Sequence, residues 1–250
     1  ATLAQTRADL NGILEKSLQR PKAILGIFMQ YAELVTTDIS TFLAELKTKK
    51  LSLEAYSAEI AKWRTMGEKV MDATAPEVHC RLLLVNCGAL KAALATKAEA
   101  IARGVADLLV AELQDKADEI SSTYKEIFDR LQENSGSAEA VIEMNNYLQA
   151  TSVKLETLQK SLHSELEERL RLLDKVNHEV PDETFEGVYM TLGWPTRVFK
   201  VADDAVKKQE EDRNHFMEEL RTDKERFEEE LEEWEVEIKA LSSLGDMAMV

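Results

Sequence analysis

The fold expected for this chain is decided by residues 185–241, which read FEGVYMTLGWPTRVFKVADDAVKKQEEDRNHFMEELRTDKERFEEELEEWEVEIKAL. Within this stretch the triplet Gly193-Trp194-Pro195 is followed by no further Pro or Gly up to Leu241. Proline suits the first turn of a helix, because its φ is already near the helical value and its missing N–H would have no partner there. Trp194, which precedes the proline, is expected in extended geometry. The triplet therefore predicts the start of a long helix.

The residues after the triplet repeat with the period of one helix face. Apolar side chains recur at intervals of four, seven, four, three, four and three residues, at Phe216, Leu220, Phe227, Leu231, Trp234, Ile238 and Leu241. A helix over residues 196–241 is about 69 Å long, more than a compact domain of this size measures, so we expect a rod-like strut. The glutamates at 228–230, 232 and 233 are expected to be its solvated face, because carboxylates around a straight helix cannot converge on one cation.

Composition narrows the class of protein. The 250 residues include only nine Gly and four Pro, which favours long helices over strands and an all-α class. With 31 Lys and Arg against 47 Asp and Glu the net charge is −16, which repels nucleic acid and anionic lipid surfaces. We therefore expect neither nucleic acid nor membrane as a partner. No 18-residue apolar run and no signal-peptide core are present, and Cys80 and Cys87 are too few for a disulfide framework, so a reducing cytoplasmic compartment is expected.

Proline and serine positions divide the first part of the chain into expected helices. A helical pattern from Leu3 to Leu18 is expected to stop at the junction of Arg20 and Pro21, where a second helix opens. That helix carries its apolar stripe as far as Leu46. Ser52 is a candidate N-cap for a third helix, which should end near Ala73 before Pro76.

Residues 76–180 are expected to hold an extended segment and a helical hairpin. The apolar run from Val78 to Cys87 has the length of a strand or small hairpin. A long helix from Ala89 to Glu133 should end in a turn at residues 134–137, where Gly136 supplies left-handed geometry. A fifth helix, residues 138–179, should then run antiparallel to it. The predicted fold is an elongated all-α bundle in three parts, residues 1–75, 76–180 and 181–250.

Residues of catalytic or metal-binding type are present but do not form a known constellation. His79, Cys80 and Cys87 have spacings of one and seven, which match no zinc pattern, so we interpret the thiols as buried in an apolar run. The other histidines, at 163, 178 and 215, lie on charged helix faces without a companion nucleophile. No G-x-x-x-x-G-K-[ST] loop occurs. We therefore predict no catalytic residue, no cofactor and no metal.

The aromatic residue Phe185, the Gly-Trp-Pro triplet and the acidic helix bearing Phe216 and Phe227 together resemble the tail of axonemal dynein heavy chains, just upstream of the linker and ATPase ring. The run LLLVNCGALKAAL, followed by Tyr124, Ile127 and Leu131, is similar to the same family. The resemblance extends from about Pro21 to the end of the strut. One departure is the ending Ser242-Ser243-Leu244-Gly245-Asp246, where the family usually continues into the start of its linker.

The resemblance implies a mechanical function in the ciliary or flagellar axoneme. Such a tail, or stem, anchors an ATP-driven microtubule motor to its doublet cargo through docking proteins. It binds intermediate and light chains or a second heavy chain, and it hands the load to the linker. The segment itself would be non-catalytic. The alternative is a homodimeric coiled-coil or spectrin-like cytoskeletal scaffold, whereas a BAR module needs a basic face that the acidic composition does not provide.

Two roles are open for the junction residues Gly193, Trp194 and Pro195. In one, the indole is a core residue that holds the strut against the preceding helices. In the other, the triplet sets the angle at which the strut departs. Packing along the strut is expected from Phe216, Leu220, Phe227, Leu231, Trp234 and Ile238. The isolated chain is expected to be monomeric, because its long helices can bury their apolar stripes against each other.

Overall fold

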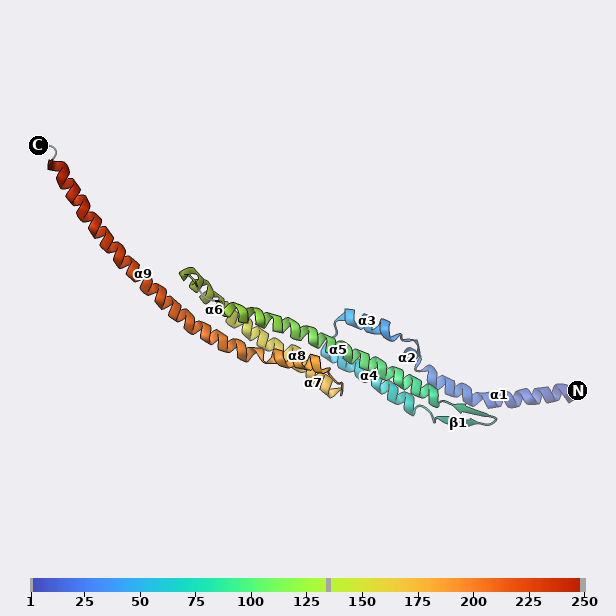
Figure 1. Cartoon of the computed structure of the whole chain (residues 1–250). Coiled ribbons are helices and arrows are strands. Elements are labelled where there is room, and N and C mark those ends of the chain that lie inside the picture. Colours follow the sequence, from blue (N-terminus) through green and yellow to red (C-terminus); the bar gives the residue numbers. More distant parts are fainter. Residues whose placement is uncertain (1, 134–135, 248–250) are drawn as a thin grey trace. The chain divides into compact units, whose positions relative to one another are not determined.

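The structure is a computed structural model that describes residues 2–133 and 136–247, nearly all of them helical (Figure 1). The all-α class is thereby confirmed, together with one small two-stranded sheet in the described part of the chain. The molecule divides into two compact units, Ala1–Asp118 with His163–Tyr189 and Glu119–Leu162 with Met190–Val250. The expected division into residues 1–75, 76–180 and 181–250 stays a prediction.

The first helix, α1 (Thr2–Met29), continues straight through Pro21. The expected break at Arg20-Pro21 is therefore wrong. A proline inside a helix removes one hydrogen bond and crowds the carbonyl four residues earlier. Here Ser17, Ile24 and Phe28 are buried at helical spacing on both sides of the proline. Burial of that face offsets the local cost, because tertiary packing overrides a single unfavourable residue.

The expectation of a single helix from Pro21 through Leu46 is also wrong, because the chain breaks twice. The short α2 (Ala32–Thr36) follows a turn at residues 30–31, and α3 (Ile39–Lys49) follows an extended Asp38. The Asp38 carboxylate accepts hydrogen bonds from the backbone N–H and the hydroxyl of Thr41, at 2.9 and 2.8 Å. Asp38 therefore competes with helix continuation and acts as an N-cap.

The expected third helix and hairpin are confirmed. Ser52 caps α4 (Leu53–Asp72), its hydroxyl accepting from the Ala55 N–H at 3.3 Å. Antiparallel strands β1 (Glu77–Cys80) and β2 (Leu83–Asn86) then pair Val78 with Val85. The hairpin base is closed where the Cys87 N–H donates to the Pro76 carbonyl at 2.7 Å.

The longest element of the first unit's core is α5 (Gly88–Leu131), a 44-residue helix. It packs close to α4 at Gly67, where an added Cβ would lie 3.3 Å from the Cβ of Ala98. The Trp63 ring is fully buried and packs edge-on against the ring of Phe42 in α3, with the ring centroids 5.5 Å apart. The core consists of buried side chains from α2, α3, α4 and α5, among them Leu34, Leu46, Tyr56, Ile60, Trp63, Val70, Ile101, Val105, Leu109 and Leu113.

The helix after the turn is interrupted once. Ser137 caps α6 (Ala138–Ser161), a π-helical segment follows at Leu162–Glu167, and α7 (Glu168–Lys175) completes the run. Asn134 and Ser135, which form half of the expected turn, lie outside the described residues, so the left-handed role of Gly136 stays a prediction. The helix ends four residues before the expected Glu179, at a left-handed Asn177 with φ of 48°.

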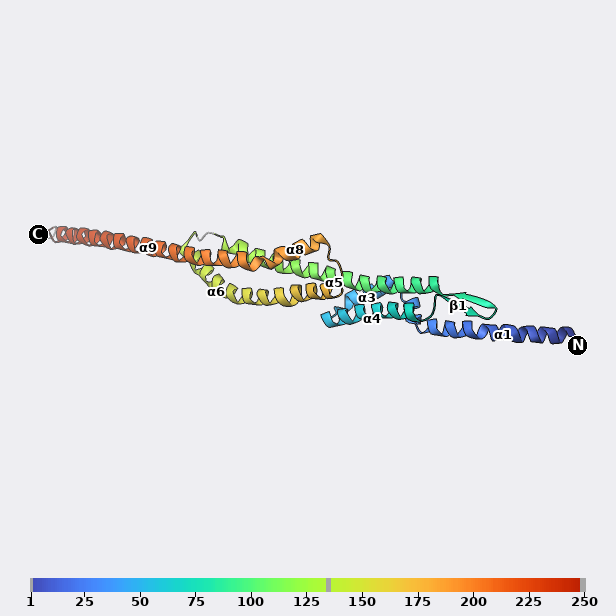
Figure 2. The same ribbon diagram turned by 90° about the horizontal axis from the view of Figure 1, so that it is seen from below.

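The second unit is a bundle of the end of α5, α6 and the first part of α9 (Trp194–Met247), which follows α8 (Asp182–Leu192). In this unit α6 runs antiparallel to α5 and lies alongside α9 (Figures 1 and 2). Its core is lined by Tyr124, Ile127, Leu131, Val141, Met144, Leu155, Leu162, Val198 and Ala205. At 54 residues, α9 is about 81 Å long.

Candidate functional site: the Trp194 junction and the C-terminal helix

The junction before α9 is nearly continuous helix. α8 ends at Leu192, the Gly193 N–H donates to the Met190 carbonyl at 3.2 Å, and α9 begins at Trp194. Pro195 therefore lies in the first turn of the helix, as predicted. The extended geometry expected for Trp194 is wrong. The residue before a proline is biased away from helical geometry, and the contacts of the indole outweigh that bias.

The Trp194 side chain joins the start of α9 to α5 inside the second unit. Its indole Nε1 donates to the Ser121 hydroxyl at 2.8 Å, and its ring lies edge-on to Phe128, with centroids 5.7 Å apart. Ser121 and Phe128 are seven residues apart, two turns along the same face of α5. The Arg197 guanidinium lies over the ring at 5.6 Å from its centroid. The half-buried indole therefore has one polar and one aromatic anchor on α5.

Burial continues along one face of α9 beyond the junction. Val198 is fully buried and Ala205, two turns later, is 8% exposed. Phe216 is half-buried, and residues 217–241 after it are all exposed. The first part of the helix is therefore packed, whereas the stretch from 217 to 241 is not.

The six residues expected to pack along the strut fall into two groups, one half-buried residue and five exposed ones. Gly193, Trp194 and Pro195 lie at the start of α9, and Phe216 is half-buried. The other five expected packing residues are exposed, at 66%, 60%, 47%, 65% and 64% for Leu220, Phe227, Leu231, Trp234 and Ile238. Their apolar stripe is uncovered within the described part of the chain.

A groove of about 830 Å³ lies between α6 and α9 where the burial ends. Val141, Ile142 and Leu148 line it from α6, and Phe216, Met217 and Leu220 line it from α9. Its charged residues are Glu210, Arg213, Glu219 and Asp223. The groove is thus lined by apolar side chains of both helices, together with three acidic residues and one arginine of α9.

A partly buried polar network in the first unit was not expected from the sequence. The Tyr56 hydroxyl donates to the Glu112 carboxylate at 2.7 Å, and the Arg169 guanidinium lies 3.9 Å from that carboxylate and 2.6 Å from Glu165. Burial, and then the bond to Glu112, raise the pKa of Tyr56. Nothing in the sequence separates Glu112 and Arg169 from the many solvated charges. The network links α4, α5 and α7.

The end of α7 is held by two further polar contacts. The Arg64 guanidinium donates to the Val176 carbonyl, and His178 Nε2 lies 2.9 Å from the Asp107 carboxylate. A cleft of about 810 Å³ adjoins them. His178, with a side chain 11% exposed, lies beyond α7 rather than on a charged helix face as expected. The bond from Arg64 satisfies one of the carbonyls that a helix end leaves unpaired.

The other residues singled out in the sequence do not gather into a site. Cys80 and Cys87 are buried free thiols, and over residues 2–133 and 136–247 no three His, Cys, Asp or Glu side chains are placed to hold a metal ion. No helix in the described residues is both long and apolar enough to cross a membrane.

Comparison with known proteins finds similarity to axonemal dynein heavy chains. No protein-family model matches the chain. It is 22% identical over 229 residues to dynein axonemal heavy chain 1 of Mus musculus, which covers 91% of this chain and 5% of that protein. The human protein of the same name is 21% identical over the same length. The chain therefore spans about 5% of the length of the curated relatives it matches. The resemblance to axonemal dynein heavy chains read from the junction and the strut is confirmed, over 91% of the chain.

Proposed function

We propose that this chain is a non-catalytic, load-bearing segment of the tail of an axonemal dynein heavy chain. In this role it connects the part of the tail that is anchored on the doublet microtubule to the linker and motor ring. Its partners would be other dynein subunits and axonemal docking proteins, and its location the ciliary or flagellar axoneme. The similarity to dynein axonemal heavy chain 1 along nearly the whole chain supports the proposal.

The observation that carries the mechanical role is how α9 begins. Trp194 attaches the first residue of a 54-residue helix to α5 by a hydrogen bond and a ring contact. Val198 and Ala205 then bury the following turns. A helix fixed over several turns resists bending there, because bending would pull interdigitated side chains out of their packing. Force applied at the far end of α9 is thereby delivered to the bundle.

The test compares chemistry with movement in a full-length heavy chain. Trp194→Ala, made within the whole protein, should leave microtubule-stimulated ATP hydrolysis unchanged and slow microtubule gliding, because the ring is intact while the helix start is loose. Phe199→Ala is the matched control, since Phe199 is an aromatic residue of the same helix that is 48% exposed, and it should glide at the parent rate. Unchanged gliding in Trp194→Ala would contradict the load-bearing role.

A second measurement tests the non-catalytic part of the proposal. The sequence carries no phosphate-cradling loop. The 250-residue chain should therefore bind neither ATP nor ADP at micromolar concentration in a fluorescence titration with a labelled nucleotide. Saturable binding would show that the segment has a nucleotide site and would favour an enzyme.

A further inference from the structure

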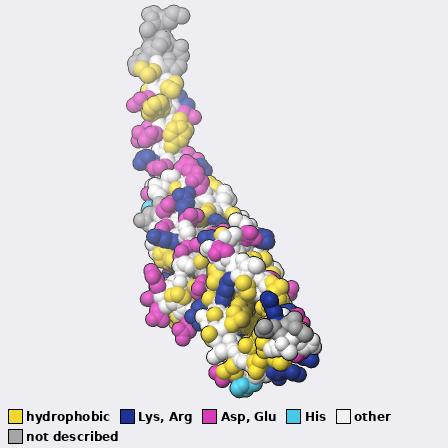
Figure 3. Space-filling view, turned by 90° about the vertical axis from the view of Figure 1, so that its right-hand side faces the viewer, with side chains coloured by type: hydrophobic (Ala, Val, Ile, Leu, Met, Phe, Trp, Pro, Cys, Tyr) yellow, Lys and Arg dark blue, Asp and Glu magenta, His cyan; other side chains and the backbone are white. Residues whose placement is uncertain are grey.

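The C-terminal half of α9 exposes an apolar stripe of unusual regularity. Figure 3 shows apolar side chains exposed there among carboxylates. Phe227, Leu231, Trp234, Ile238 and Leu241 are 60%, 47%, 65%, 64% and 67% exposed. Single exposed apolar residues are ordinary on protein surfaces, whereas a contiguous stripe with this much area marks an interaction site.

The spacing of this stripe is that of a coiled coil. The intervals from Phe227 to Leu241 are four, three, four and three residues, a strict repeat of 3.5 residues. Leu231 and Ile238 occupy a positions, and Phe227, Trp234 and Leu241 occupy d positions. In the same register Leu220 is a d residue and Met217 an a residue, while Lys224 is a polar a residue, the type that fixes the register of a pairing. We call this set, residues 217–241, the seam.

The seam continues a contact that the protein already makes. It lies on the face of α9 that α6 covers upstream, and Met217 and Leu220 also line the groove between the two helices. A helix laid on the seam would therefore take over where α6 ends, with its own end in the groove. Residues 217–241 offer about 37 Å of contact, which exceeds the length of two heptads and so reaches the range in which helix pairing is stable.

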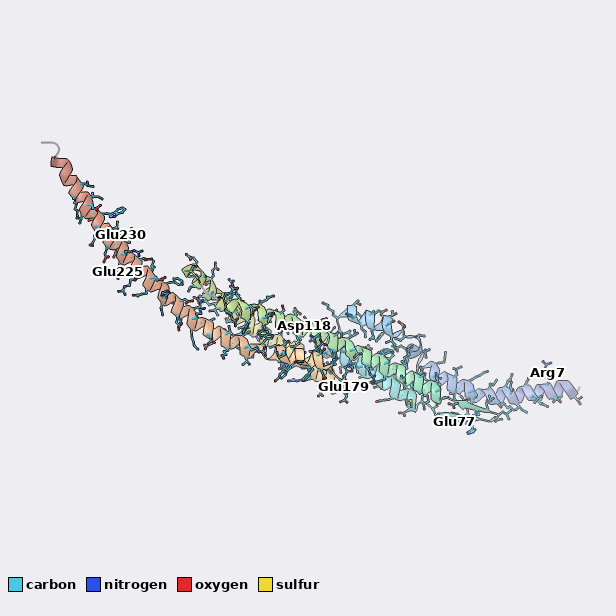
Figure 4. All side chains as sticks on the ribbon, in the orientation of Figure 1. Arg7, Glu77, Asp118, Glu179, Glu225 and Glu230 are labelled. Atoms are coloured by element: carbon cyan, nitrogen blue, oxygen red, sulfur yellow. The ribbon has the colours of Figure 1, made fainter. Side chains whose placement is uncertain are left out.

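The charges beside the seam select the partner. The e positions that flank the seam are Arg221, Glu228 and Glu235, and the g positions are Asp223, Glu230 and Glu237, so five of these six residues are acidic. Glu228 and Glu235 each have an exposed lysine of the same helix, at 3.5 and 3.4 Å. Such exposed ion pairs contribute little to stability. Lys224 and Lys239 can therefore leave these glutamates without much cost, and the glutamates are then free to pair with a partner. Figure 4 shows Glu225 and Glu230 projecting from the helix.

A second copy of this chain is a poor occupant of the seam. In a parallel pair the g glutamates of one helix would face the e glutamates of the other, and in an antiparallel pair e would face e and g would face g. A parallel pair places Asp223 against Glu228 and Glu230 against Glu235, and an antiparallel pair sets carboxylates against carboxylates at every g position and at the e positions other than Arg221. Most of the flanking contacts are therefore repulsive, which disfavours pairing. A helix with Lys or Arg at its own e and g positions would turn each of these contacts into an attraction.

We propose that the seam binds an amphipathic helix of another protein that carries Lys or Arg on both sides of its apolar stripe. The side chains of Leu231 and Ile238, with Phe227 and Trp234, are buried in this complex, and the flanking glutamates pair with the basic residues of the partner. The proposal concerns the surface of α9 and does not require that the chain belong to a motor.

The test uses the whole 250-residue chain and two synthetic helical peptides. Both have Ile at every a position, Leu at every d position and a length of about four heptads. The basic peptide has Lys at every e and g position, and the acidic peptide has Glu there. Fluorescence anisotropy should give a dissociation constant for the basic peptide at least about tenfold lower than for the acidic one. Raising the salt concentration should narrow the difference.

Variants at exposed positions assign the binding to the seam. Leu231→Asp with Ile238→Asp should weaken binding of the basic peptide by about tenfold or more. Val236→Asp is the matched control, because Val236 is 67% exposed and lies on the opposite side of the helix, and it should bind like the parent. Glu230→Lys with Glu237→Lys should reduce the preference for the basic peptide. Circular dichroism should show the same helix content in all of these variants.

Three outcomes would overturn the proposal. Equal binding of both peptides would show an unselective apolar surface. Absence of binding to the basic peptide would show that the seam does not pair with a basic helix. A dimer mass in light scattering that is lost in Leu231→Asp with Ile238→Asp would show that a second copy occupies the seam.

Discussion

The indole nitrogen of Trp194 and the hydroxyl of Ser121 are joined by a 2.8 Å hydrogen bond although 73 residues separate them in the chain. The bond fixes the first residue of α9 to α5, and Phe128 supports the same ring from its edge. A tryptophan that needs a partner for its N–H and an apolar surface for its ring finds both on one helix face. The start of α9 is therefore specified by one side chain.

Trp194→Ala should lower the free energy of unfolding by about 2 to 3 kcal/mol. Deleting a fully buried tryptophan costs about 3 to 5 kcal/mol, and this ring is half-buried. Ser121→Ala removes only the hydrogen bond and should cost about 1 kcal/mol, and Trp194→Phe, which also replaces the indole by a smaller ring, should fall between Ser121→Ala and Trp194→Ala. Urea denaturation followed by circular dichroism measures all three. Equal stability of Trp194→Ala and the parent would show that the ring does not anchor the helix.

Arg169→Met should destabilise the protein by about 2 kcal/mol, because it removes one partner of a mostly buried charge network and leaves Glu112 with Tyr56 alone. The Arg169 side chain is 13% exposed. Arg171→Met is the matched control two residues away. Arg171 is 70% exposed and pairs with Glu167 at 3.3 Å, so its loss should change stability by less than about 0.5 kcal/mol. Similar losses in both variants would contradict a special role for the network.

Two glycine-to-alanine substitutions should change the stability of the protein in opposite directions. Gly26→Ala in α1 meets nothing within 4 Å and should stabilise the protein by about 0.5 to 1 kcal/mol, since alanine favours a helix over glycine. Gly67→Ala in α4 places its Cβ 3.3 Å from the Cβ of Ala98, an atom fixed to its backbone. Overpacking of about 1 to 3 kcal/mol should there exceed the helix gain. Thermal unfolding measures both, and stabilisation by Gly67→Ala would show that the α4–α5 contact can widen.

The sequence predicts the helices whose ends carry local signals. Ser52 caps α4, and Asn86 through Gly88 leads from the hairpin into α5, where the side-chain oxygen of Asn86 accepts from the Gly88 N–H at 3.0 Å. The helix end predicted at Pro21 is wrong. The rule that a proline ends a helix considers only the neighbouring residues, whereas α1 is kept intact by the burial of Ile24 and Phe28 against the rest of the fold. The break at Asp38 is missed for a related reason. An apolar stripe can continue across a cap when two short helices pack on the same core.

The candidate site is predictable in part. Pro195 in a first helical turn follows from backbone geometry, and the seam follows from its heptad spacing. The sequence does not show whether an apolar stripe is covered. The spacing of apolar residues is the same where α6 packs on α9 and where no partner is present. The polar network of α4, α5 and α7 is not predictable either. Glu112 and Arg169 come together only when these three helices pack, and nothing in the sequence distinguishes them from exposed charged residues.

Stability at alkaline pH should depend on Tyr56. Burial, followed by the hydrogen bond to Glu112, raises the pKa of Tyr56 in the folded protein. A tyrosine in the unfolded chain titrates near about 10. Above that pH the unfolded chain loses a proton that the folded chain keeps, so the stability is fully present below about pH 10 and declines as the pH rises beyond it.

Tyr56→Phe removes this difference, so the alkaline decline should become shallower by up to about 1.4 kcal/mol per pH unit. The same variant should cost about 1 kcal/mol at neutral pH, because Glu112 loses its donor. Tyr189→Phe is the control, since Tyr189 is 68% exposed, and its alkaline decline should match that of the parent. Urea denaturation between about pH 8 and pH 11 gives the slopes. If Tyr56→Phe retains the slope of the parent, the Tyr56 hydroxyl ionises in the folded protein and the network is open to water.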